Sequence, residues 1–384
     1  MVNKVIYLDH AATTKIDDAV LKEMMPYLTN KFGNPSSLYS IGRENKQAID
    51  IARQQVANVL NCSMKEIYFT SGGSESDNLA IKGIAYANRK KGNHIITTKI
   101  EHSAVLNTCK MLEKKEFEIT YLNVDSNGRV VLNELENSIK PSTILISIMF
   151  ANNEVGTIQD IERIGNIARK NNIYFHTDAV QAIGNIRIDV QKLNIDALSM
   201  SAHKFYGPKG VGALYVRNGI MFDCIINGGH QESGKRAGTE NVAGIVGLGK
   251  AIELVYSDFD KYNEYLLRLR NQYIQNIENK IPNAYLNGDR ENRLPGNASF
   301  SFEGVMGEDI VLMLDTEGIC TSSGSACSSG GSSPSHVLSA MGQSKELAMG
   351  ALRVTFGKDN TKGDVDKIVE KLVNIIRKLR DIKN

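Results

Sequence analysis

Lys204 lies in the stretch SMSAHKFYGPKG, residues 199–210, directly after His203 and just before a Gly-Pro turn. An apolar run precedes it, and a loop that only has to be soluble needs neither the lysine nor the histidine there. The lysine is therefore either a surface charge or an amine withdrawn from water. A desolvated lysine near cationic or aromatic neighbours has a lowered pKa and can form a Schiff base with a carbonyl compound.

A second candidate is the stretch TSGGSES, residues 70–76, which lies between a strand pattern and a helix pattern. The backbone N–H groups of Gly73 and Ser74, the Ser74 hydroxyl and the positive end of the helix could together hold a phosphate. Taken alone, the same residues also describe an ordinary Ser/Gly turn that caps a helix.

Asp178 is the third candidate, at the end of a strand of apolar and aromatic residues in FHTDAVQ. A carboxylate there is unfavourable unless it is paired, and a pyridinium N–H would pair with it well. The alternative is an aspartate that caps the next helix. Phosphate cup, strand-end aspartate and strand-end lysine are the three groups that pyridoxal 5'-phosphate needs together, so their occurrence in this order predicts a site for that cofactor.

Elements that could position these groups alternate along residues 43–220. Helix patterns are expected at 43–60, at 75–92 with Gly92 as the C-cap, from Ser103, at 132–139 and at 161–172; strand patterns are expected at 66–73, 94–100, 117–124, 142–151, 173–180 and before Lys204. Such alternation predicts an α/β fold with a mainly parallel sheet covered by helices on both faces. Polar residues follow five of these strands, and in open α/β sheets ligands bind where the strands end, so we expect one crevice there.

The pattern changes after about residue 250 to a long polar helix, further strands and a last amphipathic helix with a capping box from Thr361 to Asp364. We expect a large cofactor-binding α/β domain at 15–250. The smaller α+β domain is expected to combine 1–14 with 251–384.

Composition limits the other classes. Lys+Arg 45 against Asp+Glu 43 leaves no charge excess for direct binding of nucleic acid or acidic membranes. Five scattered cysteines without a CxxC pair argue against a disulfide framework and against a zinc site, so no metal is expected and a reducing cytoplasm fits best. The N-terminus has no apolar signal region, and no uncharged run reads as a membrane span.

With these residues in view, the chain closely resembles the cysteine desulfurases, pyridoxal-phosphate enzymes of the class V aminotransferase type, and specifically their bacterial NifS/IscS-like branch. The matching motifs run in family order from residue 7 to 357: YLDHAATT, GNPSSLYSIG, FTSGGSESDNLAIKG, EHSAVL, FANNEVGTIQ, HTDAVQAIG, SAHKFYGPKGVGALYVR, RAGTENV, SSGSACSSG and LRVTFGK. The resemblance implies a homodimer with the fold of the type I pyridoxal-phosphate transferases.

The resemblance also implies roles for residues. Lys204 would be the Schiff-base lysine and Asp178 the partner of the pyridine nitrogen, while His102 would stack on the ring and serve in proton transfer. Gln181 and Asn153 would contact the O3' side of the ring. The phosphate would be held by Gly73, Ser74, Ser201 and His203, and Thr239 would reach the phosphate of the opposite subunit. Arg353 would bind the substrate carboxylate as a clamp, with Asn34 nearby.

Cys327 decides the reaction, because it lies among serines and glycines where little apolar surface is available to bury it. The composition of this loop, about 321–335, predicts exposure and flexibility, and a thiol there could ionise beside a cationic site and attack sulfur. Cys320, seven residues earlier, is expected to pack at the start of a strand. The family's nucleophile aligns with Cys327 only, which could also serve as a cluster ligand during transfer.

The resemblance thus implies a cysteine desulfurase that converts L-cysteine to L-alanine and leaves a persulfide on Cys327. The sulfur would pass to an acceptor protein, either an iron–sulfur scaffold or a tRNA-thiolation enzyme. The alternatives are a selenocysteine lyase or another class V aminotransferase on the same scaffold, and a scaffold protein without catalysis.

Overall fold

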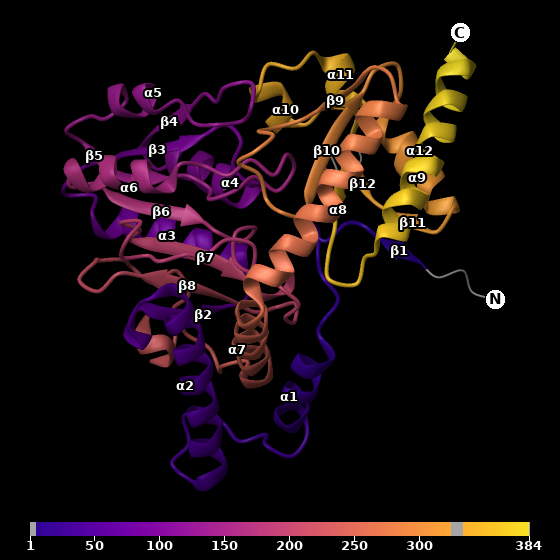
Figure 1. The fold of residues 1–384 in the computed structure, drawn as a ribbon. Helices are drawn as coiled ribbons and strands as arrows, with labels where there is room; N and C mark the ends of the chain where they lie inside the picture. Colours follow the sequence, from indigo (N-terminus) through magenta and orange to yellow (C-terminus); the bar gives the residue numbers. More distant parts are fainter. Residues whose placement is uncertain (1–4, 324–332, 384) are drawn as a thin grey trace.

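A seven-stranded sheet forms the centre of the larger lobe in the computed structural model, which describes residues 5–323 and 333–383 (Figure 1). Its strand order is β2-β8-β7-β6-β5-β3-β4. The strands are β2 Ile67–Thr70, β3 His94–Thr98, β4 Glu118–Leu122, β5 Thr143–Ser147, β6 Tyr174–Asp178, β7 Ala197–Ser201 and β8 Gly212–Val216. The pairs from β4 through β7 are parallel, and β8 runs antiparallel to both of its neighbours. The expected mainly parallel sheet is confirmed.

Both faces of this sheet are covered, because successive residues of a strand point to opposite sides and here both sides are buried. Ile95 packs in one hydrophobic cluster and Ile96 in another, and Leu145 and Ile146 divide in the same way. The helices around the sheet are α1 Asp18–Leu28, α2 Ser40–Leu60, α3 Gly73–Ala87, α4 Ser103–Glu113, α5 Leu132–Asn137, α6 Ile161–Lys170 and α7 Val242–Ser257. Apolar side chains of α3 and α4 pack on one face of the sheet, and apolar side chains of α2, α6 and α7 pack on the other face.

The smaller lobe holds a four-stranded sheet of order β12-β13-β10-β9 and a two-stranded sheet of β1 and β11. Its strands are β1 Ile6–Tyr7, β9 Ala284–Leu286, β10 Asn297–Phe302, β11 Ile319–Cys320, β12 Ser322–Ser323 and β13 Ala351–Thr355. Its helices are α8 Phe259–Lys280, α9 Gly307–Thr316, α10 His336–Ala340, α11 Lys345–Met349 and α12 Lys362–Lys383. A separate core joins β1, β10 and β13 to α8 and α12. The domain boundaries at 14/15 and 250/251 stay a prediction.

The structure tests three local predictions: the end of a helix at Gly92, the capping box from Thr361 to Asp364 and the loop at 321–335. The helix expected to close at Gly92 ends earlier, at Ala87 with Asn88 as its C-cap, and Gly92 instead packs where a Cβ would lie 2.2 Å from the Ser142 carbonyl oxygen. The capping box is confirmed, since the Thr361 N–H donates to Asp364 Oδ2 and the Asp364 N–H donates to Thr361 Oγ1. Within the loop expected at 321–335, Ser322–Ser323 form β12 and Ser335 caps α10, while 324–332 lie outside the described residues.

Among the described helices, none combines the length and the apolar composition that crossing a membrane would require.

Candidate active site

A cavity of about 340 Å³ opens at the carboxyl ends of the central strands, where the sheet meets the N-terminal segment and β13. Ten of the thirteen residues predicted for the site line it: Gly73, Ser74, His102, Asn153, Asp178, Gln181, Ser201, His203, Lys204 and Arg353. They come from the N-terminus of α3, the residue before α4, the ends of β6 and β7, the segments that follow β5, β6 and β7, and β13. The structure therefore brings together residues that are up to 280 positions apart, Gly73 and Arg353 being the extremes.

Lys204 ends the short 3₁₀ turn Ala202–Lys204 that follows β7. Its Nζ donates hydrogen bonds to the carbonyl oxygens of Ala11 at 2.6 Å and Ala12 at 2.8 Å. The tight turn beyond it depends on Gly207, where a Cβ would lie 2.7 Å from the Cβ of Ala202. The amine is thus held at the cavity wall by two backbone carbonyls, half-buried rather than on an open surface.

Asp178 is the last residue of β6 and is 6% exposed. Its Oδ1 accepts the backbone N–H of Val180 at 2.9 Å, but residues 179–196 form turns and no helix, so the helix-capping alternative is wrong and the side chain faces the cavity. Burial raises the pKa of this carboxyl, while His102, the Val180 N–H and Lys204 act in the opposite direction. Its position suits the binding of a cationic N–H donor.

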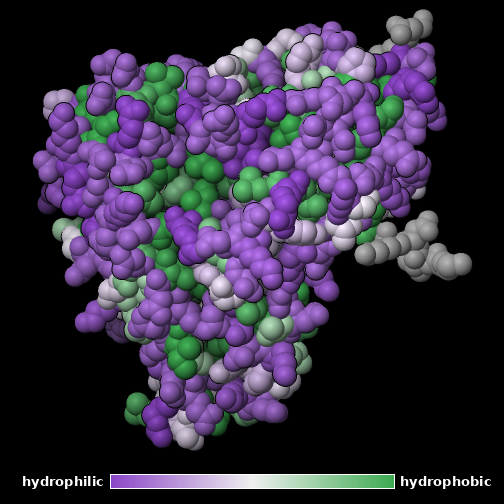
Figure 2. Space-filling model, in the orientation of Figure 1, coloured by the Kyte–Doolittle hydropathy of each residue, from purple (hydrophilic) through white to green (hydrophobic). Residues whose placement is uncertain are grey.

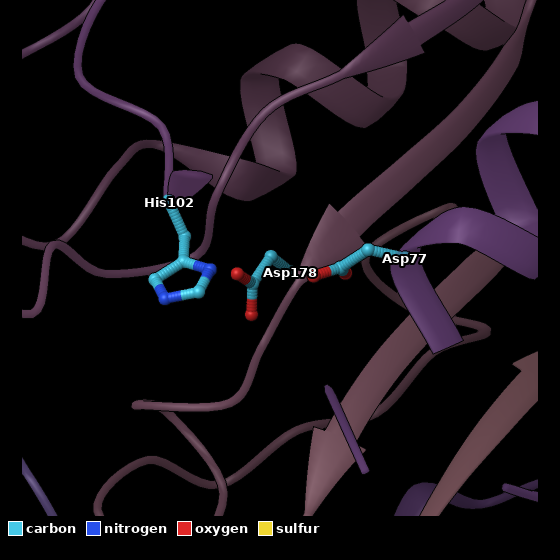
Figure 3. A group of neighbouring side chains, drawn as sticks. All are labelled: Asp77, His102 and Asp178. Atoms are coloured by element: carbon cyan, nitrogen blue, oxygen red, sulfur yellow. The ribbon is translucent and has the colours of Figure 1, made fainter. Parts of the chain in front are cut away.

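His102 lies beside Asp178, as Figure 3 shows, and is the N-cap of α4. Its Nδ1 accepts the backbone N–H of Ala104 at 3.2 Å. Burial lowers the pKa of the imidazole. A neutral ring whose Nδ1 is an acceptor carries its proton on Nε2, so Nε2 is the atom that can exchange a proton.

The N-terminus of α3 supplies the phosphate cup. Its N-cap residue, Gly72, has no side chain that could accept the first N–H groups of the helix, which leaves them for an anion. Gly73 is required there, because a Cβ would lie 2.6 Å from Val180 Cγ2. Ser201 and His203 line the same cavity; burial, and then Lys204, lower the pKa of His203 to about 4, so its ring is neutral at pH 7.

Arg353 closes the opposite side of the cavity from β13 and is 6% exposed. Its Nη1 donates to the carbonyl oxygen of Asn153 at 3.0 Å and its Nη2 to Asp9 Oδ1 at 2.7 Å. The buried Nε has no hydrogen-bond partner among the described residues, and the two hydrogen bonds above use only two of the five N–H donors of the guanidinium. Gln181 fixes the neighbouring wall by donating from Nε2 to the Ala11 carbonyl oxygen at 3.0 Å.

The donor set fits pyridoxal phosphate. An uncapped helix N-terminus with nearby hydroxyls suits its phosphate, a buried carboxylate suits its ring nitrogen, and a lysine amine suits its aldehyde. The nearest ligand atoms of Asp77, His102 and Asp178 lie within 4.8 Å of one another, a spacing that a metal ion could also bridge (Figure 3). We assign this group to the organic cofactor because Lys204 and the phosphate cup complete that cofactor's requirements and add nothing to a metal site.

The three other predicted residues are not brought to this cavity. Asn34 is exposed, and its Oδ1 accepts the backbone N–H of Ser36 at 2.9 Å. Thr239 is exposed in the loop before α7. Cys327 lies outside the described residues.

Two aspartates of the cavity were not singled out from the sequence. Asp77 follows Gly73 by four residues, which places it on the helix face that packs against the sheet, and a charged residue on a buried face was the available signal. Asp9 carries no local signal, because its partner Arg353 is 344 residues away.

Comparison with known proteins gives concordant findings. The family model for class V aminotransferases matches residues 6–368. The chain is 56% identical over 382 residues to a protein named cysteine desulfurase IscS from Clostridium botulinum, covering 99% of this chain and 96% of that one. A solved structure described as a NifS-like protein superposes with a TM-score of 0.92 at 41% identity, covering 97% of this chain and all of that one. Another, described as SspA in complex with cysteine, superposes with a TM-score of 0.82 at 38% identity, covering 92% and 99%.

Proposed function

We propose that this chain, which belongs to the class V aminotransferase family and is a pyridoxal-phosphate-dependent cysteine desulfurase, takes the sulfur of L-cysteine onto Cys327 and passes it to an acceptor protein. The observation that carries the assignment of roles is the single cavity in which Lys204, Asp178, His102 and Arg353 meet. The SspA structure in complex with cysteine is a relative whose ligand matches the proposed substrate.

The cofactor, when bound, supplies an electron sink that makes the α-proton of the bound amino acid acidic. Lys204 holds the aldehyde end of the site and is the base that takes and returns a proton at the substrate α-carbon, because its Nζ already lies at the cavity wall. Asp178 holds the ring nitrogen. His102, protonated on Nε2, is placed to exchange a proton at the substrate or the ring.

Arg353 binds the substrate carboxylate. Asp9 and the Asn153 carbonyl fix the two Nη atoms, so the guanidinium is oriented before the substrate arrives. A planar guanidinium recognises a carboxylate better than a lysine would, because it presents several donors in a fixed geometry.

Cys327 is the proposed acceptor of sulfur: its thiolate would form an S–S bond to the substrate sulfur as the substrate Cβ–S bond breaks, and the electron pair of that bond would stay on the carbon skeleton, which takes up a proton and leaves as alanine. Ser322, five residues before it, lines the cavity, and five residues of chain can span up to about 18 Å, a length compatible with delivery of the thiol to the substrate. Ser335, eight residues after Cys327, is held in place because its Oγ donates a hydrogen bond to the buried Glu154 carboxylate at 2.5 Å. Cys320 is a poor alternative, because it pairs with Tyr7 between β11 and β1 and burial raises its pKa.

We further propose that the enzyme is a homodimer in which Thr239 reaches the phosphate site of the partner subunit. Thr239 is exposed in the described chain, as a residue that acts on a second copy must be before assembly. Exposed large side chains also occur along the segment from α1 to the start of α2, where Figure 2 shows scattered apolar residues on a mainly hydrophilic surface; they include Leu28, Phe32, Leu38 and Tyr39. The proposed acceptor is an iron–sulfur scaffold protein or a tRNA-thiolation enzyme in the cytoplasm.

The test is a comparison of Cys327→Ala with Cys320→Ala, each incubated as holoenzyme with isotopically labelled cysteine. Cys327→Ala should still bind pyridoxal phosphate and still change its visible spectrum with cysteine, yet release no alanine and carry no protein-bound sulfur. Cys320→Ala should release alanine and carry protein-bound sulfur, as wild type does. A persulfide mapped to Cys320, or full turnover by Cys327→Ala, would show that another group accepts the sulfur.

A further inference from the structure

Asp77 is a second buried carboxyl group in the cofactor cavity, and the chemistry above does not use it. It lies in the first turns of α3 and is 1% exposed. Figure 3 shows its side chain directed towards Asp178, with His102 on the other side of Asp178. The nearest ligand atoms of these residues lie within 4.8 Å of one another.

Behind Asp77 lies a chain of uncharged polar groups. Asp77 Oδ1 is 3.7 Å from His176 Nε2, and both ring nitrogens of His176 bind hydroxyl groups, Ser147 Oγ at 2.9 Å and Ser199 Oγ at 3.0 Å. His176 is fully buried, and that burial lowers the pKa of its ring to about 3. The imidazole is therefore neutral at pH 7 and provides no positive charge that would stabilise an ionised Asp77.

The two carboxyl groups are not equivalent. Burial, then Asp178 and Glu101, raise the pKa of Asp77 well above its usual value, with only Ser199 acting in the other direction. Asp178 is also buried, but His102, the Val180 N–H and Lys204 all lower its pKa. Two buried carboxylates this close cannot both be ionised, and the surroundings favour the charge on Asp178 and the proton on Asp77.

We propose that Asp77 is a positioning residue for Asp178: it is retained as a neutral carboxylic acid beside the Ser147–His176–Ser199 network, so that of these two neighbouring carboxyl groups only Asp178 is charged, where the ring nitrogen of the cofactor would bind. The inference rests on the proposed role of Asp178. An ionised Asp77 would place a second negative charge beside Asp178, and an apolar residue in its place would remove the polar group that faces Ser199.

The test compares Asp77→Asn with Asp77→Leu, two side chains that branch at Cγ as aspartate does and of which only the first keeps neutral polar groups. Asp77→Asn should bind pyridoxal phosphate within about threefold of wild type, whereas Asp77→Leu should bind it about ten- to a hundredfold more weakly. Dissociation constants are measured by titrating the apoprotein with cofactor. Circular dichroism and sedimentation confirm that each variant is folded and has the wild-type assembly state.

Infrared difference spectra give a second readout that a purely structural role would not move. At pH 7 the spectrum of Asp77→Asn holoenzyme should lack a deuterium-sensitive carbonyl band of a protonated carboxylic acid that wild type has. Glu101→Gln is the matched control, because burial raises the pKa of Glu101 to about 8 and it contributes a band of its own.

The outcomes distinguish a failure of the role inferred for Asp77 from a failure of the role proposed for Asp178. If Asp77→Asn lost an ionised-carboxylate band, or weakened cofactor binding as much as Asp178→Asn does, Asp77 would carry the charge and the inference would be wrong. Wild-type affinity in Asp77→Leu would equally overturn it. If instead Asp178→Asn bound the cofactor normally, the proposed function of Asp178 would fail, whatever Asp77 does.

Discussion

The Nη2 atom of Arg353 donates a 2.7 Å hydrogen bond to Asp9 Oδ1, joining β13 to the segment that follows β1 across 344 positions of sequence. Both side chains are largely buried, at 7% and 17% exposed. Asp9 also pairs through its backbone with Thr355. The guanidinium is thus fixed by the protein itself and needs no substrate to order it.

We predict that Arg353→Ala raises the KM for cysteine and leaves pyridoxal phosphate binding unchanged, because a carboxylate clamp contacts the substrate and not the cofactor. The lost charge-assisted contact corresponds to about ten- to a hundredfold in KM. Steady-state alanine production measures KM, and cofactor titration measures the second quantity. Arg268→Ala, at an exposed position of α8, is the control. Unchanged kinetics in Arg353→Ala would place the substrate carboxylate elsewhere.

Lys204 is predicted to be the lysine that bonds to the cofactor. Borohydride reduction of the yellow holoenzyme, followed by peptide mapping, should place the pyridoxyl group on Lys204. Lys204→Ala should yield none, whereas Lys209→Ala, five residues on in an exposed turn, should behave as wild type. A pyridoxyl group on another lysine would overturn the site assignment.

Thr239→Ala should weaken cofactor retention by about five- to tenfold, the value of one hydrogen bond. Because the contact is proposed to cross between subunits, the effect should appear only in the dimer. Sedimentation equilibrium and cofactor titration on the same samples test both parts. A stable, fully active monomer would remove the basis for the contact.

The stability of the protein should depend on pH through His176, whose pKa of about 3 lies below the value of about 6.5 for an unfolded chain. Between those values the unfolded state binds a proton that the folded state does not. The free energy of unfolding therefore falls as pH falls below 6.5, by about 1.4 kcal/mol per pH unit from this residue.

His176→Gln lacks this titration, so its deficit relative to wild type should shrink by about 1.6 kcal/mol in total between pH 6.5 and 5, since the unfolded state is half protonated at pH 6.5. Urea unfolding at constant ionic strength measures the difference, from which the other titrating groups cancel. A deficit that is the same at both pH values would show that His176 is not held neutral.

The sequence patterns predicted the sheet and, of the cavity residues, the phosphate cup and the two strand-end residues that interrupt or follow apolar runs; the other cavity residues came from the resemblance to the cysteine desulfurases. Asp178 and Lys204 stand out at strand ends for that reason. Asp77 did not, since it lies within a helix whose polar and apolar positions alternate less clearly. Gly92 was misassigned because a glycine after a helix also serves close packing between loops. The Asp9–Arg353 contact had no local signature, and the roles of Thr239 and Asn34 depend on chemistry outside their own surroundings.

The pairing of β1 with β11 has a consequence for synthesis on the ribosome. Ile6 and Tyr7 find their strand partners only at Ile319 and Cys320, and Asp9 finds Thr355 later still. At translation rates of about 5–20 residues per second, the N-terminal segment waits on the order of tens of seconds for these partners. The central sheet lies wholly within residues 67–216 and can assemble during that time. Arg353 also forms part of the cavity wall, so a nascent chain cannot complete its cofactor cavity before residue 353 has been synthesised.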